Sequence, residues 1–166
     1  MTEREEDKQY NDIVKSLIGE EICSLSNSQY FFNDEKVDED LGEIEIETVS
    51  GLKVCFKLLS DGESVGAYSG DLYVPSSFEV NDGEQASWKK IPIEQEFNVT
   101  GSKIVAIDTM YDKYLKFNSE VLAGWRVKLA NQNYFVFYNC GDNAKILFNE
   151  LPDDAIEGIV TTWQPI

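Results

Sequence analysis

The sequence predicts a mainly β (α+β) protein in which one N-terminal amphipathic helix precedes a pseudo-duplicated antiparallel β domain. Three observations support this fold class. Helical spacing of apolar residues is confined to the start of the chain, and the remainder is mostly short runs of Ile, Val, Tyr and Phe separated by turn residues. The chain also matches itself at an offset of 81 residues. Its 166 residues, 42% of them apolar, suit a single domain over 1–166 with a real core.

The first element is a helix over residues 3–18. Thr2 and Glu5 have the spacing of a capping box, in which each side chain satisfies a backbone amide of the first turn. Gly19 ends the periodic pattern. The apolar residues at helical intervals are Tyr10, Ile13, Val14, Leu17 and Ile18.

The β region contains an internal repeat. Segment 41–65 falls on segment 122–146 without a gap, and a shift of one residue extends the match backwards to Gly19 and Gly101. The matched apolar pairs are Ile22 with Ile104, Leu25 with Ile107, Leu41 with Leu122, Ile44 with Trp125, Ile46 with Val127, Val54 with Phe135, Phe56 with Phe137 and Val65 with Ile146. We interpret the pattern as a tandem duplication, and chance similarity between amphipathic hairpins is the alternative.

The repeat divides the chain into consecutive parts. Unit one covers 19–65, an inserted acidic-aromatic segment covers 66–100, unit two covers 101–146, and a C-terminal segment covers 147–166. In this last segment we expect a helical turn at 152–156 and a final strand over 159–163. Asp61 and Asp142 match each other where hairpins should turn, so we interpret both as turn formers.

Each cysteine matches an aliphatic residue in the other unit. Cys23 matches Val105, Cys55 matches Val136 and Cys140 matches Leu59. We therefore interpret the thiols as small buried apolar groups rather than nucleophiles. Their odd number and scattered spacing argue against disulfides and against zinc.

The composition excludes several classes of function. The chain has 31 acidic and 14 basic residues, a net charge of −17, and no histidine. Ser-His-Asp and Cys-His catalysis and His-ligated zinc are therefore impossible. Nucleic acid and anionic membranes should be repelled, so the expected partners are cationic surfaces or neutral molecules. Because the N-terminus is acidic and no apolar run approaches the roughly 20 residues of a membrane span, we expect a cytoplasmic protein.

No cofactor or metal ion is expected. The sequence lacks the glycine-rich loops that hold phosphates. Asp38, Asp40 and Gly42 resemble the start of a calcium loop, but the glycine comes one residue early. No pair of carboxylates has a spacing that nominates it for acid-base catalysis, so an enzyme is not expected.

Negative charge is concentrated in the first half of the chain. Segment 34–47 has eight carboxylates and one lysine, whereas its match, 115–128, has one acid and three bases. Glu45 and Glu47 match Arg126 and Lys128, which suggests cross-strand ion pairs if the units lie side by side. The acids without such an explanation are Asp34, Glu35, Asp38, Glu39 and Asp40. They form either a binding surface or a solvated loop kept for solubility.

The segment between the units alternates aromatic and acidic residues. Such a mixture suits an interface with a basic partner, because aromatic anchors exclude water and carboxylates accept hydrogen bonds from Arg and Lys. The candidate acids here are Asp71, Glu79, Asp82 and Glu84. Trp88 is the best candidate for an exposed anchor, whereas Tyr73, Val74 and Phe78 are expected to face inward, and Trp125 and Trp163 to serve the core.

A small, acidic, histidine-free chain with an aromatic-acidic segment on a duplicated β scaffold resembles bacterial immunity proteins. The resemblance is one of type and assigns no residue roles. It implies that the chain binds a cognate toxin domain with a basic surface, commonly a nuclease, and blocks it at or beside the active site. Two alternatives stay open: a DNA mimic or adaptor that binds several basic partners, and a carboxylate-based hydrolase.

Overall fold

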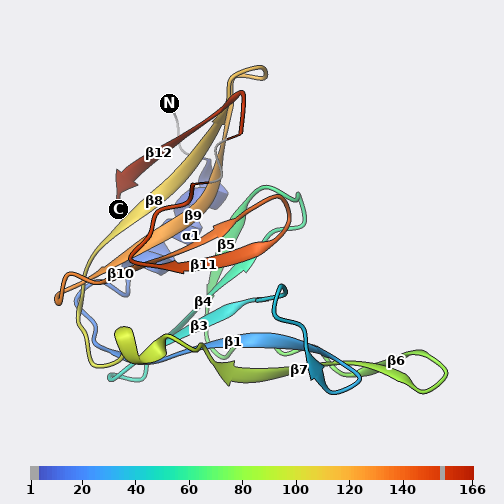
Figure 1. The fold of residues 1–166 in the computed structure, drawn as a ribbon. Coiled ribbons are helices and arrows are strands. Elements are labelled where there is room, and N and C mark those ends of the chain that lie inside the picture. Colours follow the sequence, from blue (N-terminus) through green and yellow to red (C-terminus); the bar gives the residue numbers. More distant parts are fainter. Residues whose placement is uncertain (1–3, 154–155) are drawn as a thin grey trace.

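The structure is a computed structural model that describes residues 4–153 and 156–166. It confirms the predicted fold class, since it contains one N-terminal helix and two antiparallel sheets (Figure 1). The predicted last strand is also present, as Ile159–Pro165. The helical turn expected at 152–156 includes residues 154 and 155, which lie outside the described residues.

Helix α1 (Glu5–Lys15) is shorter than the predicted span of 3–18. Its first turn holds three acids and its last turn holds Lys15, which suits the positive and negative ends of the helix dipole. Residues 16–19 form a turn, which Gly19 ends at a φ of +91°. The predicted capping residue Thr2 lies outside the described residues.

The strands form two sheets. The first has the order β5-β4-β3-β1-β7-β6, with β2 also paired to β1, and the second has the order β11-β10-β9-β8-β12. The first sheet consists of β1 (Ile22–Phe32), β2 (Glu35–Lys36), β3 (Ile44–Thr48), β4 (Lys53–Leu58), β5 (Val65–Ser69), β6 (Phe78–Asn81) and β7 (Glu84–Pro92). After the short 3₁₀ helix η1 (Glu96–Asn98), the second consists of β8 (Ile104–Tyr114), β9 (Ser119–Leu129), β10 (Tyr134–Asn139), β11 (Ala144–Phe148) and β12 (Ile159–Pro165).

A short antiparallel pairing joins the two sheets where β1 and β8 begin. Its central bridge places Glu21 opposite Lys103, the residue that matches it at an offset of 82. The surrounding hydrogen bonds occur in equivalent pairs: the Gly19 amide donates to Ile104 and the Gly101 amide to Ile22, each at 2.8 Å. An antiparallel bridge between equivalent residues places a local two-fold axis through the bridge.

The two sheets also share their irregularities. The pairing of β1 with β3 is interrupted between Ile22 and Ser24, and the pairing of β8 with β9 between Ile104 and Ala106, which are equivalent positions. β7 lies beside β1 as β12 lies beside β8. Segment 66–100 is therefore not wholly an insertion, because β7 has a counterpart in the C-terminal segment.

The gapless match between segments 41–65 and 122–146 ends at the hairpin turns, because these turns differ in length. Six residues separate the paired ends Leu58 and Val65, whereas four separate Asn139 and Ala144, so Val65 corresponds to Ala144 and not to Ile146.

Asp61 has the predicted turn role, because it accepts hydrogen bonds from the amides of Glu63 and Ser64 at 2.9 and 2.8 Å. Burial opposes its ionisation, yet a hydrogen bond from the Ser64 hydroxyl together with these two amide bonds keeps the pKa of Asp61 below its ordinary value. Asp142 lies in the other turn at a φ of +67°.

The main core lies between the two sheets. Phe56 of β4 packs against Trp125 of β9 and Phe137 of β10, with ring centroids 4.8 and 5.7 Å apart. All three side chains are fully buried, and α1 adds Val14 and Leu17. Trp125 thus serves the core as predicted. Trp163 instead lies partly exposed in a smaller cluster, with the Arg126 guanidinium 4.7 Å from its ring centroid.

Different segments cover equivalent parts of β1 and β8. Asn11 of α1 accepts hydrogen bonds from the Trp125 indole at 2.9 Å and from Thr109 of β8 at 3.2 Å. Asn27 of β1 corresponds to Thr109, and its amide donates to the Leu41 carbonyl at 2.7 Å. Loop 37–43 therefore serves β1 as helix α1 serves β8, and these two segments depart from the two-fold symmetry.

The three cysteines differ in exposure. Cys55 is fully buried as predicted, and burial raises the pKa of its thiol to about 12. Cys140 is partly buried. Cys23 is exposed, so its interpretation as a buried apolar group is wrong. It lies at the irregularity of β1, and its equivalent Val105 is also half exposed, at 50%.

The predicted ion pairs between matched residues are also wrong. Arg126 pairs with Asp108 at 2.6 Å and Lys128 with the same carboxylate at 2.9 Å, whereas Glu45 pairs with Lys90 at 2.6 Å. The sheets meet through the core, so their charged outer faces point apart. The ion pairs of Glu45, Arg126 and Lys128 therefore each lie within one sheet.

We expect Asn11→Ala to lower the free energy of unfolding by about 2 kcal/mol, because the buried Trp125 and Thr109 donors lose their acceptor. Urea unfolding followed by tryptophan fluorescence measures the change. Gln9→Ala, at an exposed position of the same helix, is the control and should change stability by less than about 0.5 kcal/mol. Equal stability of the two variants would contradict the role of Asn11.

Asp108→Asn should cost about 3 kcal/mol at neutral pH, because it leaves Arg126 without its carboxylate. Burial opposes ionisation of Asp108, but hydrogen bonds from Lys128 and Arg126 outweigh it and hold its pKa below the ordinary value. The stabilisation is therefore complete above about pH 5 and decreases as the pH falls through the native pKa. Unfolding curves at several pH values should show the gap between wild type and variant closing in acid. A gap independent of pH would contradict this assignment.

Candidate functional site

Four strands extend from the first sheet as an arm, which we define as residues 28–36 and 78–90. The end of β1 pairs with β2 on one side and with β7 on the other, and β7 pairs with β6. Figure 1 shows the β6–β7 hairpin reaching well beyond the rest of the molecule. All four residues of β6 are exposed.

The tip of the arm brings together five of the ten predicted site residues. The turn after β1 and the strand β7 lie side by side, because the Asn33 amide donates to the Gln85 carbonyl at 2.9 Å and the Gln85 amide to Asn33 Oδ1 at 2.8 Å. The tip carboxylates are Asp34, Glu35, Glu79, Asp82 and Glu84. Lys36 is the one basic residue in 30–36 and 78–88. The tip is therefore strongly negative.

Two of the tip carboxylates also shape their own turn. Glu79 accepts a hydrogen bond from the Gly83 amide at 3.2 Å, and Glu84 accepts one from the Asn81 side chain at 3.2 Å. Gly83 has a φ of +77°, which favours glycine over residues with a Cβ. Glu79 nevertheless stays exposed and Glu84 partly exposed. These two acids thus combine a local structural role with negative surface charge.

An aromatic stack runs along one face of the arm. Tyr30 and Trp88 are opposite each other on β1 and β7, with ring centroids 5.1 Å apart, and Phe78 of β6 lies 5.8 Å from Trp88 on its other side. Trp88 is half-buried between its neighbours, so it is not the freely exposed anchor predicted. Phe78 is 54% exposed and Tyr73 63%, and Val74 is also exposed, which contradicts the expectation that they face inward. An interface here would use the edge of the stack and the ring of Phe78.

The other predicted acids lie away from the tip. Asp38, Glu39 and Asp40 belong to loop 37–43, whose carbonyls accept hydrogen bonds from Asn27 and Gln29. Their carboxylates are exposed, and Asp38 lies 3.5 Å from Lys36. Asp38 and Glu39 face residues 143–147 of the second sheet across a shallow hollow. The loop therefore covers the base of the arm.

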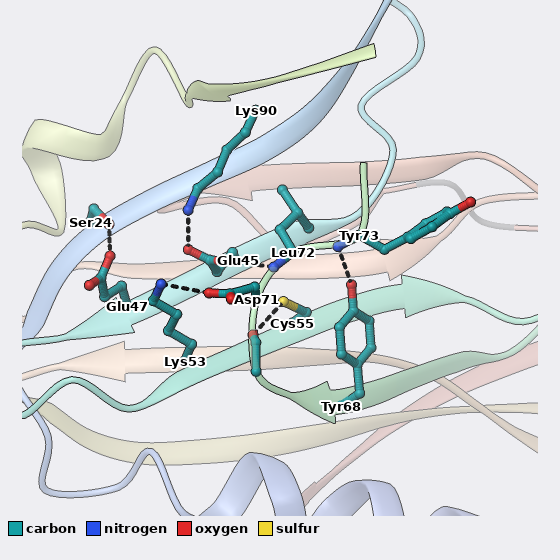
Figure 2. A network of polar contacts seen from close by, with 11 residues as sticks. Ser24, Glu45, Glu47, Lys53, Cys55, Tyr68, Asp71, Leu72, Tyr73 and Lys90 are labelled. Carbon is teal, nitrogen blue, oxygen red and sulfur yellow. Dashed lines mark hydrogen bonds and ion pairs between the residues drawn. The ribbon is translucent and has the colours of Figure 1, made fainter. Parts of the chain in front are cut away.

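Asp71 lies on a strap, residues 70–77, that follows β5 across the outer face of the first sheet (Figure 2). Its carboxylate pairs with Lys53 at 2.7 Å, and this contact lowers the pKa of Asp71 and raises that of Lys53. The carboxylate is exposed, so the pair adds little to stability.

Glu45 holds the same strap from beneath. Its carboxylate is fully buried, accepts a hydrogen bond from the Leu72 amide at 2.8 Å and pairs with Lys90 at 2.6 Å (Figure 2). Leu72 belongs to the strap and Lys90 to β7, so one carboxylate connects the sheet, the strap and the arm. The sequence did not identify this role, although the alternation of β3 already placed Glu45 on the outer face.

Tyr68 and Cys55 complete this network. The Tyr68 hydroxyl donates to Glu43 at 2.7 Å and accepts from the Tyr73 amide at 3.0 Å, while the Cys55 thiol donates to the Gly70 carbonyl at 3.5 Å. Burial, supported by the bond to Glu43, raises the pKa of Tyr68 well above its ordinary value. The hydroxyl therefore stays protonated and serves as a fixed hydrogen-bond donor.

Within residues 4–153 and 156–166, no three His, Cys, Asp or Glu side chains are placed to hold a metal ion, and no helix is long and apolar enough to cross a membrane. Comparison with protein-family models finds no match, and no curated protein or solved structure matches the chain. The geometry of the chain itself is therefore the guide to its function.

We expect Lys90→Met to lower the free energy of unfolding by about 3 kcal/mol, because it leaves the buried Glu45 carboxylate without its cation. Lys53→Met is the matched control. It removes the other lysine of the network from an exposed carboxylate and should cost no more than about 1 kcal/mol. Thermal or urea unfolding of both variants provides the comparison. Equal losses would show that Glu45 does not anchor the strap and arm.

Proposed function

We propose that the chain is an inhibitor of the immunity-protein type, which binds a cognate toxin domain with a basic surface through the tip of the arm. One observation supports this most strongly: the tip of the arm carries five carboxylates and one lysine, and a partly exposed aromatic stack lies on the same projecting strands, with Lys89 and Lys90 further from the tip. A nuclease cleft that binds nucleic acid is basic and therefore has the complementary charge.

The two features of the tip act at different stages of binding. The carboxylates attract a cationic surface at long range, which raises association rates towards about 10⁸–10⁹ M⁻¹s⁻¹ at low salt. Phe78 and the edge of Trp88 then bury apolar surface at the contact, which slows dissociation. The Glu45 network holds β7 in place beforehand, so less conformational entropy is lost on binding.

The first test is co-expression with the product of the adjacent upstream gene, tagged for purification. We expect a stable complex in which the activity of that protein is inhibited. Failure of the two proteins to co-purify would count against the immunity function. Displacement of DNA from several unrelated basic proteins would instead support the DNA mimic.

A kinetic test locates the interface on the arm. Asp34, Glu35 and Asp82 are changed to Lys together, and the control changes Asp12, Glu94 and Glu150, three exposed acids outside the arm, in the same way. Both variants alter net charge equally, but we expect only the first to slow association about tenfold or more and to weaken its salt dependence. Surface plasmon resonance at several salt concentrations measures this. Equal effects in the two variants would place the interface elsewhere.

Trp88→Ala tests the aromatic stack. We expect dissociation to accelerate about tenfold to a hundredfold with little change in the association rate, because the stack acts only after contact. Trp163→Ala, which removes the partly exposed tryptophan of the second sheet, is the control and should leave both rates unchanged. Unaltered dissociation in the Trp88 variant would exclude the stack from the interface.

A further inference from the structure

A second candidate site lies outside the arm. A cavity of about 310 Å³ opens beside the second sheet, between β8, β10, β12 and the β4–β5 turn. This volume is at the lower end of the range for small-molecule sites. Its described lining includes three acids, Glu63, Asp112 and Asp153, together with Met110, Tyr114, Tyr138 and Thr161.

The internal symmetry shows why space is present here. Asp112 corresponds to Tyr30 at an offset of 82, and Thr161 lies opposite Asp112 as Trp88 lies opposite Tyr30. In the first sheet, stacked aromatic rings occupy these positions. In the second sheet, two small polar side chains replace the rings, so the fold itself does not require this pair.

Acidic, hydroxyl and aromatic side chains all line the cavity. Asp112 accepts a hydrogen bond from the Thr161 hydroxyl at 2.6 Å, and it forms no ion pair with any residue of the described ranges. No Lys or Arg is among the described lining residues. Burial raises the pKa of Asp112, and burial together with nearby Glu63, Asp112 and Asp61 raises that of Tyr114. The carboxylate thus lies in a partly buried site whose described lining contains no cation.

We propose that this cavity binds a small organic cation of the alkylammonium class. The ammonium group donates hydrogen bonds to the Asp112 carboxylate and lies against the tyrosine rings, whose faces attract cations. The alkyl chain packs on Met110. The site shares none of these residues with the arm, so it is independent of the proposed inhibitor function.

The probe is n-butylammonium chloride, titrated into labelled protein at constant ionic strength and followed by two-dimensional amide NMR. We expect saturable shifts at Met110, Tyr114 and Tyr138. n-Butanol has nearly the same shape without the charge and should bind at least about tenfold more weakly, since it lacks the charge-assisted hydrogen bond. N-acetyl-lysine-methylamide should also bind more weakly, because its two amide groups would lose water without gaining partners.

Two variants test the assigned residues. Asp112→Asn keeps the acceptor for Thr161 but removes the charge, and it should weaken butylammonium binding about tenfold or more, whereas Asp40→Asn on the exposed loop should not. Thr161→Trp introduces the residue found at the equivalent position of the first sheet and should abolish binding by filling the cavity. Absence of saturable binding, equal affinity for butanol, or full affinity in either variant would overturn the proposal. Tighter binding of the lysine analogue would overturn the assignment to a free amine.

Discussion

The antiparallel bridge between Glu21 and Lys103 is the constraint on which the architecture depends, because it joins the first strands of the two sheets through equivalent residues. The apolar faces of the two sheets pack together in one core cluster. Phe56 of one half then meets Trp125 and Phe137 of the other. Neither half could bury this surface alone, so the core and the local two-fold axis are two consequences of one pairing.

The functional features are the places where the two halves differ. Helix α1 covers the polar residues of β8, while loop 37–43 covers their equivalents on β1. The arm continues β1 with an acidic turn and a two-stranded hairpin, whereas the corresponding part of the second sheet leaves a cavity lined by Asp112 and Thr161. The inward-facing apolar residues of both halves build the same scaffold, so the outward-facing positions are free to differ. The two halves differ most in the charge and the aromatic content of these outward-facing positions.

The sequence could predict the shared scaffold but only part of the site. The apolar matches on the central strands, such as Ile44 with Trp125 and Phe56 with Phe137, are equivalent paired positions, because inward-facing positions alternate and tolerate few changes. The match of Val65 with Ile146 is not, since the preceding hairpin turns differ in length. The equivalence of β7 and β12 was hidden, since the segments that precede them differ in length and change the offset. The partner of Glu45 was also missed, because Lys90 becomes its neighbour only when β7 pairs with β1. The exposure of Phe78 was misjudged because alternation identifies an inward face only where another layer covers the strand.

The buried Glu45 carboxylate links the scaffold to the arm. The desolvation cost of burying this charge indicates what the ion pair contributes. A buried ion pair seldom stabilises a protein more than apolar residues of the same volume would, because both charges must be desolvated. The ion pair instead fixes orientation, since the Glu45 carboxylate accepts hydrogen bonds from one strap amide and one lysine in a fixed geometry. Arg126 occupies the equivalent position in the second sheet with the opposite charge, and its partner Asp108 lies on the adjacent strand β8. Glu45 instead reaches beyond β1 to Lys90 on β7, so it orients the strand that carries Trp88.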